Sequence, residues 1–155
     1  MEYQISALDE QAFAHLFGAD DNELARHSAV RMTVDVHPGY PCRTTLADAE
    51  VGEQVLLVNY EHLPVASPYR STHAVFVREG AKTVVPFVNE VPESLQLRLL
   101  SVRGFDCYGM MVNADVVKGS ALEEVIEKMF ADPGIDFLHI HNAKPGCYAA
   151  RVDRL

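Results

Sequence analysis

Apolar and polar residues alternate along several stretches of the chain, which is typical of β-strands with one buried face. Between residues 30 and 36, for example, every second residue is Val or Met and the residues between them are polar. Residues 54–60 are almost uninterruptedly apolar, which indicates a central strand covered on both faces. Residues 83–88 contain Pro86, which predicts an edge strand. Before the C-terminal segment, we predict strands over residues 3–8, 30–36, 54–60, 73–78, 83–88 and 110–116.

Helical spacing is confined to a few short stretches. The clearest lies in residues 120–131, where apolar side chains recur at the spacing of one helix face. We predict two more helices, over residues 9–17 and 20–28. The pattern of residues 90–100 fits either a helix or a strand. Strands therefore outnumber helices, without regular strand–helix–strand alternation. We predict an α+β fold in which residues 1–155 form a single domain, with a mainly antiparallel sheet and a few short flanking helices.

The last predicted element is a C-terminal β-hairpin, formed by residues 136–141 and 147–153 around a Pro-Gly turn. Alternation places Leu138 and Ile140 on one face and His139 and His141 on the other. A five-residue loop over 142–146 keeps the first face apolar, so we prefer that register. It predicts Cys147 opposite His141, and it pairs His139 with Ala149, Ile140 with Tyr148 and Leu138 with Ala150. His139, His141 and Cys147 would then line one face, with Arg151 further along it.

This hairpin leaves three interpretations open. His139, His141 and Cys147 form a ligand set that zinc accepts, although His-x-His alone is a weak pattern. His37, His62 and His73 are candidates for a fourth ligand without a telling spacing. Alternatively, Cys147 or Cys42 could act as a nucleophile with His141 as its base, which would need no cofactor. As the third interpretation, each residue is an ordinary part of a sheet.

Two loops contribute further candidates for binding a substrate. Arg43 and Arg70 each lie in a loop, and an arginine can hold a carboxylate or a phosphate through two hydrogen bonds. Tyr60 ends the central strand, where side chains often border a cleft, and Asn142 begins the hairpin turn. These residues suggest a small anionic or electrophilic substrate, although we favour an ordinary solvated arginine at each of the two arginine positions.

Composition narrows the class of protein. The chain has 13 basic and 22 acidic residues and a formal net charge of −9, which argues against nucleic-acid binding and against docking on anionic membranes. The N-terminus has no basic start or apolar run, so we expect no secretory signal. Three cysteines without a CxxC motif suit a reducing cytoplasm. A homodimer through the edge strand at Pro86 is a further expectation.

Four segments together resemble a known family. They are PGYPCR (38–43), EVGEQVLLVNYEH (50–62), PYRSTHAVFVRE (68–79) and HIHNAKPGC (139–147). Their order and spacing are similar to the bacterial family called domain of unknown function 1203, over nearly the whole chain. The resemblance implies no activity. It implies only that a few positions recur in the family: Cys42, Arg43, His139, His141, Asn142, Gly146 and Cys147.

The sequence therefore predicts a site where the Pro-Cys-Arg loop (residues 41–43) meets the hairpin. Three functions remain open for it: a small Cys/His enzyme, a metal-binding protein, and a module that binds a small molecule or a partner without catalysis.

Overall fold

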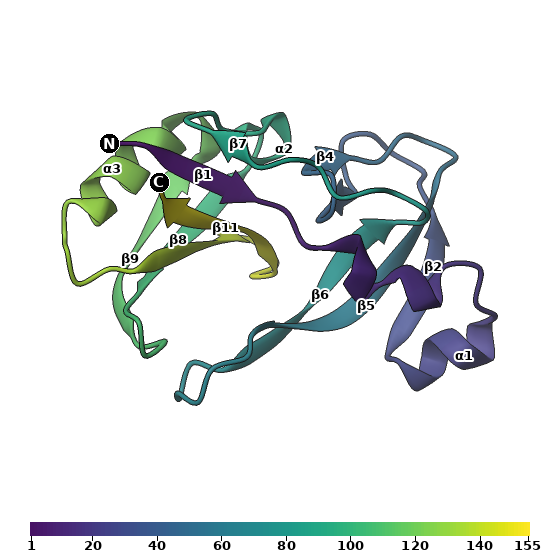
Figure 1. The fold of residues 1–155 in the computed structure, drawn as a ribbon. Helices are drawn as coiled ribbons and strands as arrows, with labels where there is room; N and C mark the ends of the chain where they lie inside the picture. Colours follow the sequence, from purple (N-terminus) through teal and green to yellow (C-terminus); the bar gives the residue numbers. More distant parts are fainter.

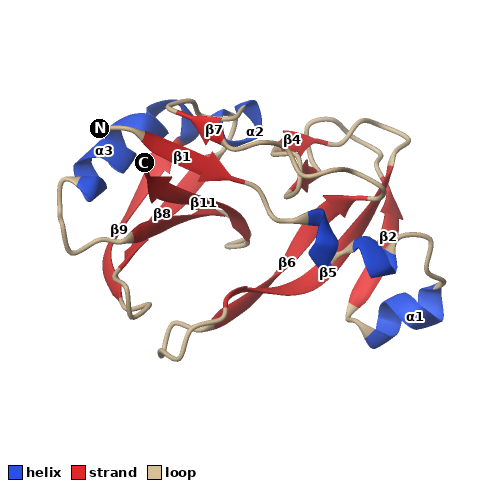
Figure 2. Ribbon diagram, viewed as in Figure 1, coloured by secondary structure: helices blue, strands red, loops and turns tan.

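The computed structural model describes residues 1–155 and contains two β-sheets, one on each side of the view in Figures 1 and 2. All neighbouring strands are antiparallel except β3 and β6. The α+β prediction with a mainly antiparallel arrangement is confirmed. The six-stranded sheet consists, in spatial order, of β7 (Phe87–Val88), β1 (Tyr3–Ser6), β11 (Tyr148–Arg154), β10 (Phe137–Asn142), β8 (Leu99–Phe105) and β9 (Met111–Lys118). The five-stranded sheet consists of β2 (Ala29–Thr33), β5 (Gln54–Leu63), β6 (Ser71–Arg78), β3 (Pro41–Cys42) and β4 (Ala47–Asp48).

The helices are short and lie at the periphery of the sheets (Figure 2). They are α1 (Asp21–Arg26), α2 (Glu93–Gln96) and α3 (Leu122–Phe130). The helix predicted over residues 9–17 is wrong, because this segment forms the 3₁₀ turns Glu10–Ala12 and Ala14–Leu16. Phe13 lies between them with a φ of −122°, which interrupts helical geometry. Both interpretations of residues 90–100 occur in succession, since α2 is followed by β8. No helix has the length and apolar character of a membrane span.

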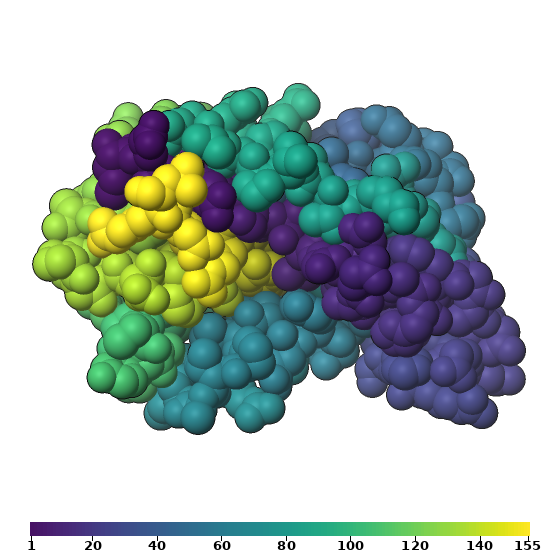
Figure 3. Space-filling model, viewed as in Figure 1, coloured from purple at the N-terminus to yellow at the C-terminus, as the bar shows by residue number.

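Each sheet has its own hydrophobic core. Leu138 and Ile140 pack with α3 in the larger core, under the six-stranded sheet. The second core lies against the five-stranded sheet and includes Tyr148, although this residue belongs to β11 of the other sheet. Strands β6 and β11 are in contact, and the space-filling view shows the two parts of the chain packed together (Figure 3). Tyr148 therefore helps to join the sheets.

The predicted hairpin register is wrong by two residues over most of its length. Ile140 pairs with Ala150 and His139 with Arg151, while a bulge shifts the pairing so that His141 lies opposite Tyr148. The turn spans residues 143–147, closed by a 2.8 Å hydrogen bond from the Gly146 N–H to the Asn142 carbonyl. Because the shift is an even number of residues, the apolar face keeps its residues. Tyr148 thus occupies the place opposite His141 that was predicted for Cys147.

Candidate functional site

Four histidines meet between the two sheets. His62 lies on β5 and His73 on β6 of the five-stranded sheet, whereas His139 and His141 lie on β10 of the six-stranded sheet. One ring nitrogen from each of His62, His139 and His141 lies within 4.8 Å of the other two, and all three residues are buried. We call these three residues the histidine cluster. Its members come from both sheets, so the packing of one sheet on the other creates it.

Two irregularities in strand pairing accompany the cluster. On β5, Glu61 pairs with Thr72 and Leu63 pairs with Ser71, which leaves His62 as the extra residue of a bulge. A second bulge lies opposite the step from Ile140 to His141. Bulges bend a strand and redirect side chains, and they are common beside functional sites. The backbone at both places thus departs from regular pairing where the histidines converge.

The hydrogen bond of His141 determines which nitrogen carries its proton. Its Nδ1 lies 2.9 Å from the Gly146 carbonyl oxygen. A carbonyl oxygen only accepts, so Nδ1 is the donor. In the neutral ring, Nε2 then has no proton and presents a lone pair. This Nε2 is buried and has no hydrogen-bond partner, which is unusual for a buried polar atom.

The other cluster members lie close enough to share one ligand. His62 Nδ1 and His139 Nδ1 are 3.3 Å apart. On its far side, His62 Nε2 lies 2.6 Å from Nδ1 of His73 and 3.3 Å from the Ser71 hydroxyl oxygen. If His62 donates through Nε2, its Nδ1 presents a lone pair toward His139. The His73 and Ser71 contacts can therefore orient the His62 ring as outer partners orient metal-binding histidines.

Burial keeps the cluster uncharged. Removal from water is the main reason why the pKa of His62 falls to about 4, that of His139 to about 2 and that of His141 to about 3. Neighbouring charges, among them Arg103, lower all three pKa values further. The rings are therefore neutral at pH 7, and a neutral imidazole is the form that binds a metal ion.

The Pro-Cys-Arg loop meets the hairpin through Arg43, which is 1 % exposed. Its Nε donates to the Tyr148 carbonyl oxygen at 2.7 Å, its Nη1 to the Pro41 carbonyl oxygen, and its Nη2 to Cys147 Sγ at 3.1 Å. Asn142 Nδ2 also lies 3.6 Å from this sulfur. The hydrogen-bond partners of Cys147 are thus Arg43 and Asn142, and no histidine is among them.

The other predicted cysteine, Cys42, is buried within the five-stranded sheet. Its sulfur lies 3.2 Å from the Thr44 hydroxyl oxygen and accepts the Arg78 backbone N–H at 3.2 Å. Burial raises the pKa of this thiol, but hydrogen bonds from Arg78 and Thr44 outweigh that effect and lower it overall. Neither Cys42 nor Cys147 has a hydrogen bond to His141 in this structure.

Three further candidates are not members of the cluster. Arg70 is exposed and forms a two-pronged ion pair with Glu61, at 3.0 and 3.1 Å. Tyr60 is half-buried and packs against Phe13. His37 bonds through Nδ1 to the Ala49 carbonyl oxygen at 3.0 Å. Each of these side chains has a structural partner of its own.

The sequence offered His62 and His73 only as two of three candidates for a fourth ligand and gave no reason to prefer them. His62 is 77 residues from its neighbour His139, and the two belong to no common motif. The only available signal was their position at the ends of two predicted strands, which does not say where those ends lie relative to the hairpin.

Comparison with known proteins gives a family and no function. No curated protein and no solved structure matches the chain significantly. The family model described as "Protein of unknown function (DUF1203)" matches residues 39–154. This range includes the histidine cluster, Arg43 and Cys147, and it covers most of the chain. The resemblance seen in the sequence is therefore confirmed, and the chain belongs to the DUF1203 family.

Proposed function

We propose that this protein binds one divalent transition-metal ion, foremost zinc, through His62, His139 and His141. The observation that carries the proposal is the Nε2 atom of His141, a buried lone pair without a partner, on a ring that has a nitrogen within 4.8 Å of nitrogens of two other imidazoles. A metal ion would satisfy this atom. The set differs from the one predicted from the sequence, since His62 takes the place of Cys147.

The chemistry of the donors fits such an ion. Zinc binds imidazole nitrogen at about 2.0–2.1 Å, and three protein ligands leave its fourth position for water or substrate. In this cluster His141 is oriented by the Gly146 carbonyl and His62 by its contact with His73. When bound, the metal would supply Lewis-acid chemistry at that fourth position. The competing Cys/His enzyme has less support, because no cysteine is hydrogen-bonded to a histidine.

Zinc titration by calorimetry tests this proposal. The protein is treated with EDTA, dialysed and titrated with Zn²⁺, and we expect one site per chain. His62→Gln removes one imidazole at a modest change in volume and should abolish or greatly weaken binding. His15→Gln is the matched control, because His15 is exposed and is not a member of the cluster.

Thermal unfolding provides a second measurement. Free Zn²⁺ at about 1,000 times its dissociation constant stabilises a one-site protein by about 4 kcal/mol, or roughly 10 °C for a domain of this size. We expect this shift in the wild type and in the His15 variant. The proposal fails if the folded wild type binds no Zn²⁺, or if His62→Gln, still folded by circular dichroism, binds it as tightly.

A further inference from the structure

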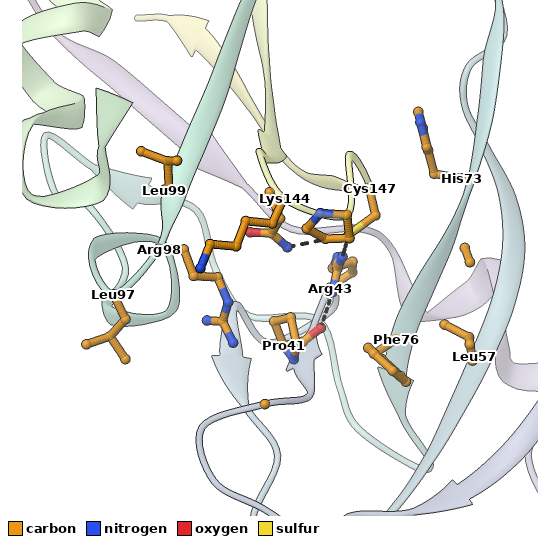
Figure 4. A pocket seen from close by; sticks show the side chains of 14 residues that line it. Pro41, Arg43, Leu57, His73, Phe76, Leu97, Arg98, Leu99, Lys144 and Cys147 are labelled. Atoms are coloured by element: carbon orange, nitrogen blue, oxygen red, sulfur yellow. Dashed lines mark hydrogen bonds between the residues drawn. The ribbon is translucent and has the colours of Figure 1, made fainter. Parts of the chain in front are cut away.

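A cavity of about 600 Å³ opens between the Pro-Cys-Arg loop, the hairpin turn and β8 (Figure 4). Its size is that of a small-molecule site. Cys147 and Arg43 lie at its centre, Lys144 and Arg98 on one side, and Phe76 and Leu57 on the other. It is distinct from the histidine cluster, although His73 lies on its wall and contacts His62.

The charges on the cavity wall are all positive. Arg43, Arg98 and Lys144 line it, and no Asp or Glu does, although acidic residues outnumber basic ones by 22 to 13 in the whole chain. Arg98 is neutralised by an ion pair with Asp48. Arg43 and Lys144 form no ion pair. Two positive charges on the wall therefore have no carboxylate partner.

Of Arg43 and Lys144, Arg43 gives the stronger indication of a bound anion. A buried cation without an anionic partner is costly, and burial indeed lowers the pKa of Arg43. A guanidinium has five N–H donors, of which three bond to Tyr148, Pro41 and Cys147. Two donors have no partner in the chain, and Arg43 is one of the residues that line the cavity.

The other lining residues indicate what the uncharged part of the ligand would contact. Asn142 lines the cavity and is 6 % exposed, and its Nδ2 lies 3.6 Å from Cys147 Sγ. Much of the other surface is apolar, with Leu57, Phe76, Leu97 and Leu99 among the lining residues. This surface suits an apolar body better than it suits a fully hydrated ion such as inorganic phosphate.

We infer that this cavity binds a small organic carboxylate, whose anionic group lies at Arg43 and Lys144 and whose aliphatic or aromatic body lies on Phe76 and Leu57. The site is separate from the histidine cluster and requires no metal. Binding would cover Cys147, the one cysteine on the cavity wall.

Ligand-observed fluorine NMR tests the inference with 4-(trifluoromethyl)benzoate as the probe. The neutral 4-(trifluoromethyl)benzamide is its matched control, and inorganic phosphate is a competitor without an apolar body. The protein is first freed of metal with EDTA and then dialysed to remove the chelator, so that a carboxylate bound to a metal cannot mimic the result. We expect the benzoate to bind about tenfold more tightly than the amide, and phosphate not to displace it at equal concentration.

Charge reversal at the rim locates the site. Lys144→Glu should weaken benzoate binding about five- to tenfold. Lys128→Glu makes the same change in net charge on α3, at an exposed position outside the cavity, and should alter binding less than about twofold. Lys144 is itself exposed, so both variants should fold.

Alkylation by iodoacetamide gives an independent measurement within one molecule. The benzoate should slow the alkylation of Cys147 and leave that of Cys107, which is exposed, unchanged. Equal binding of benzoate and amide, binding of neither at millimolar concentration, an unchanged affinity in Lys144→Glu, or unprotected Cys147 would each overturn the inference. Binding that appears only with added Zn²⁺ would also overturn it, and would instead place the carboxylate on the metal.

Discussion

Replacing Arg43 by Met should destabilise the protein far more than the same change at an exposed arginine. The Arg43 guanidinium ties the two sheets together, because it bonds to the Tyr148 carbonyl on β11 and to the Pro41 carbonyl on β3. Met has a similar length but no donor. The variant therefore leaves both carbonyl oxygens without this partner while retaining most of the packing volume.

The size of the effect follows from the burial of these two oxygens. The hydrogen bond to the Tyr148 oxygen is fully buried, and the bond to the Pro41 oxygen is partly buried. A buried polar group left unsatisfied costs about 1–3 kcal/mol, with less for a group that water can reach. Removing the buried positive charge returns part of this cost. We expect a net loss of about 2–4 kcal/mol, a large share of the roughly 5–15 kcal/mol that stabilise a typical domain.

Urea unfolding in EDTA measures the loss without any contribution from metal. With a slope of about 2 kcal/mol per molar urea, the midpoint should fall by about 1–2 M. Arg70→Met is the matched control, because Arg70 also forms a two-pronged interaction, with Glu61, but has a side chain that is 61 % exposed. Exposed ion pairs contribute about 0.2–1 kcal/mol. Equal losses in the two variants would refute the role given to Arg43, as would a loss below about 1 kcal/mol in Arg43→Met.

Two further predictions concern the scaffold. Gly119→Ala should lower the free energy of unfolding by about 2 kcal/mol or more, since the added Cβ would lie 1.8 Å from the Leu95 carbonyl oxygen. Gly52→Ala is the control and should lower it by only about 1 kcal/mol, because this position has open space and a φ of +91°. Equal midpoints of the two variants in urea would contradict this prediction. Glu79 has its pKa lowered below 4.5, chiefly by a hydrogen bond from Arg31, so its contribution is present above pH 4.5 and is lost as pH falls through the lower folded pKa. The difference in unfolding free energy between wild type and Glu79→Gln should thus shrink toward acid, and a difference that grows toward acid would show the sign to be wrong.

The spacing of apolar residues along the sequence was sufficient to predict the fold class and to predict which hairpin residues share a face. Leu138 and Ile140 face the core because side chains alternate along a strand, and this remained true although the predicted pairing was two residues out. The pattern could not supply the pairing itself. A bulge and the closure of the turn at Gly146 determined how β10 pairs with β11. The apolar pattern could not do so, because a register shift by any even number of residues keeps the same side chains on the apolar face.

The composition of the site was decided by tertiary structure. His139 and His141 were recognisable as a pair, because they are two residues apart on one strand. Their partner His62 comes from the other sheet, and its position depends on how two sheets twist, bulge and pack. Arg43 was recognisable as a candidate, but only the packing shows that its guanidinium is buried against the hairpin. Alternation depends on neighbouring residues alone, and for this reason the sequence determined most of the longer strands and the faces of the hairpin. Other positions differ from the prediction, since only Phe87–Val88 of residues 83–88 form a strand and Val112 and Val116 are exposed. Contacts between sheets depend on the whole chain, so the folded structure determined which side chains meet.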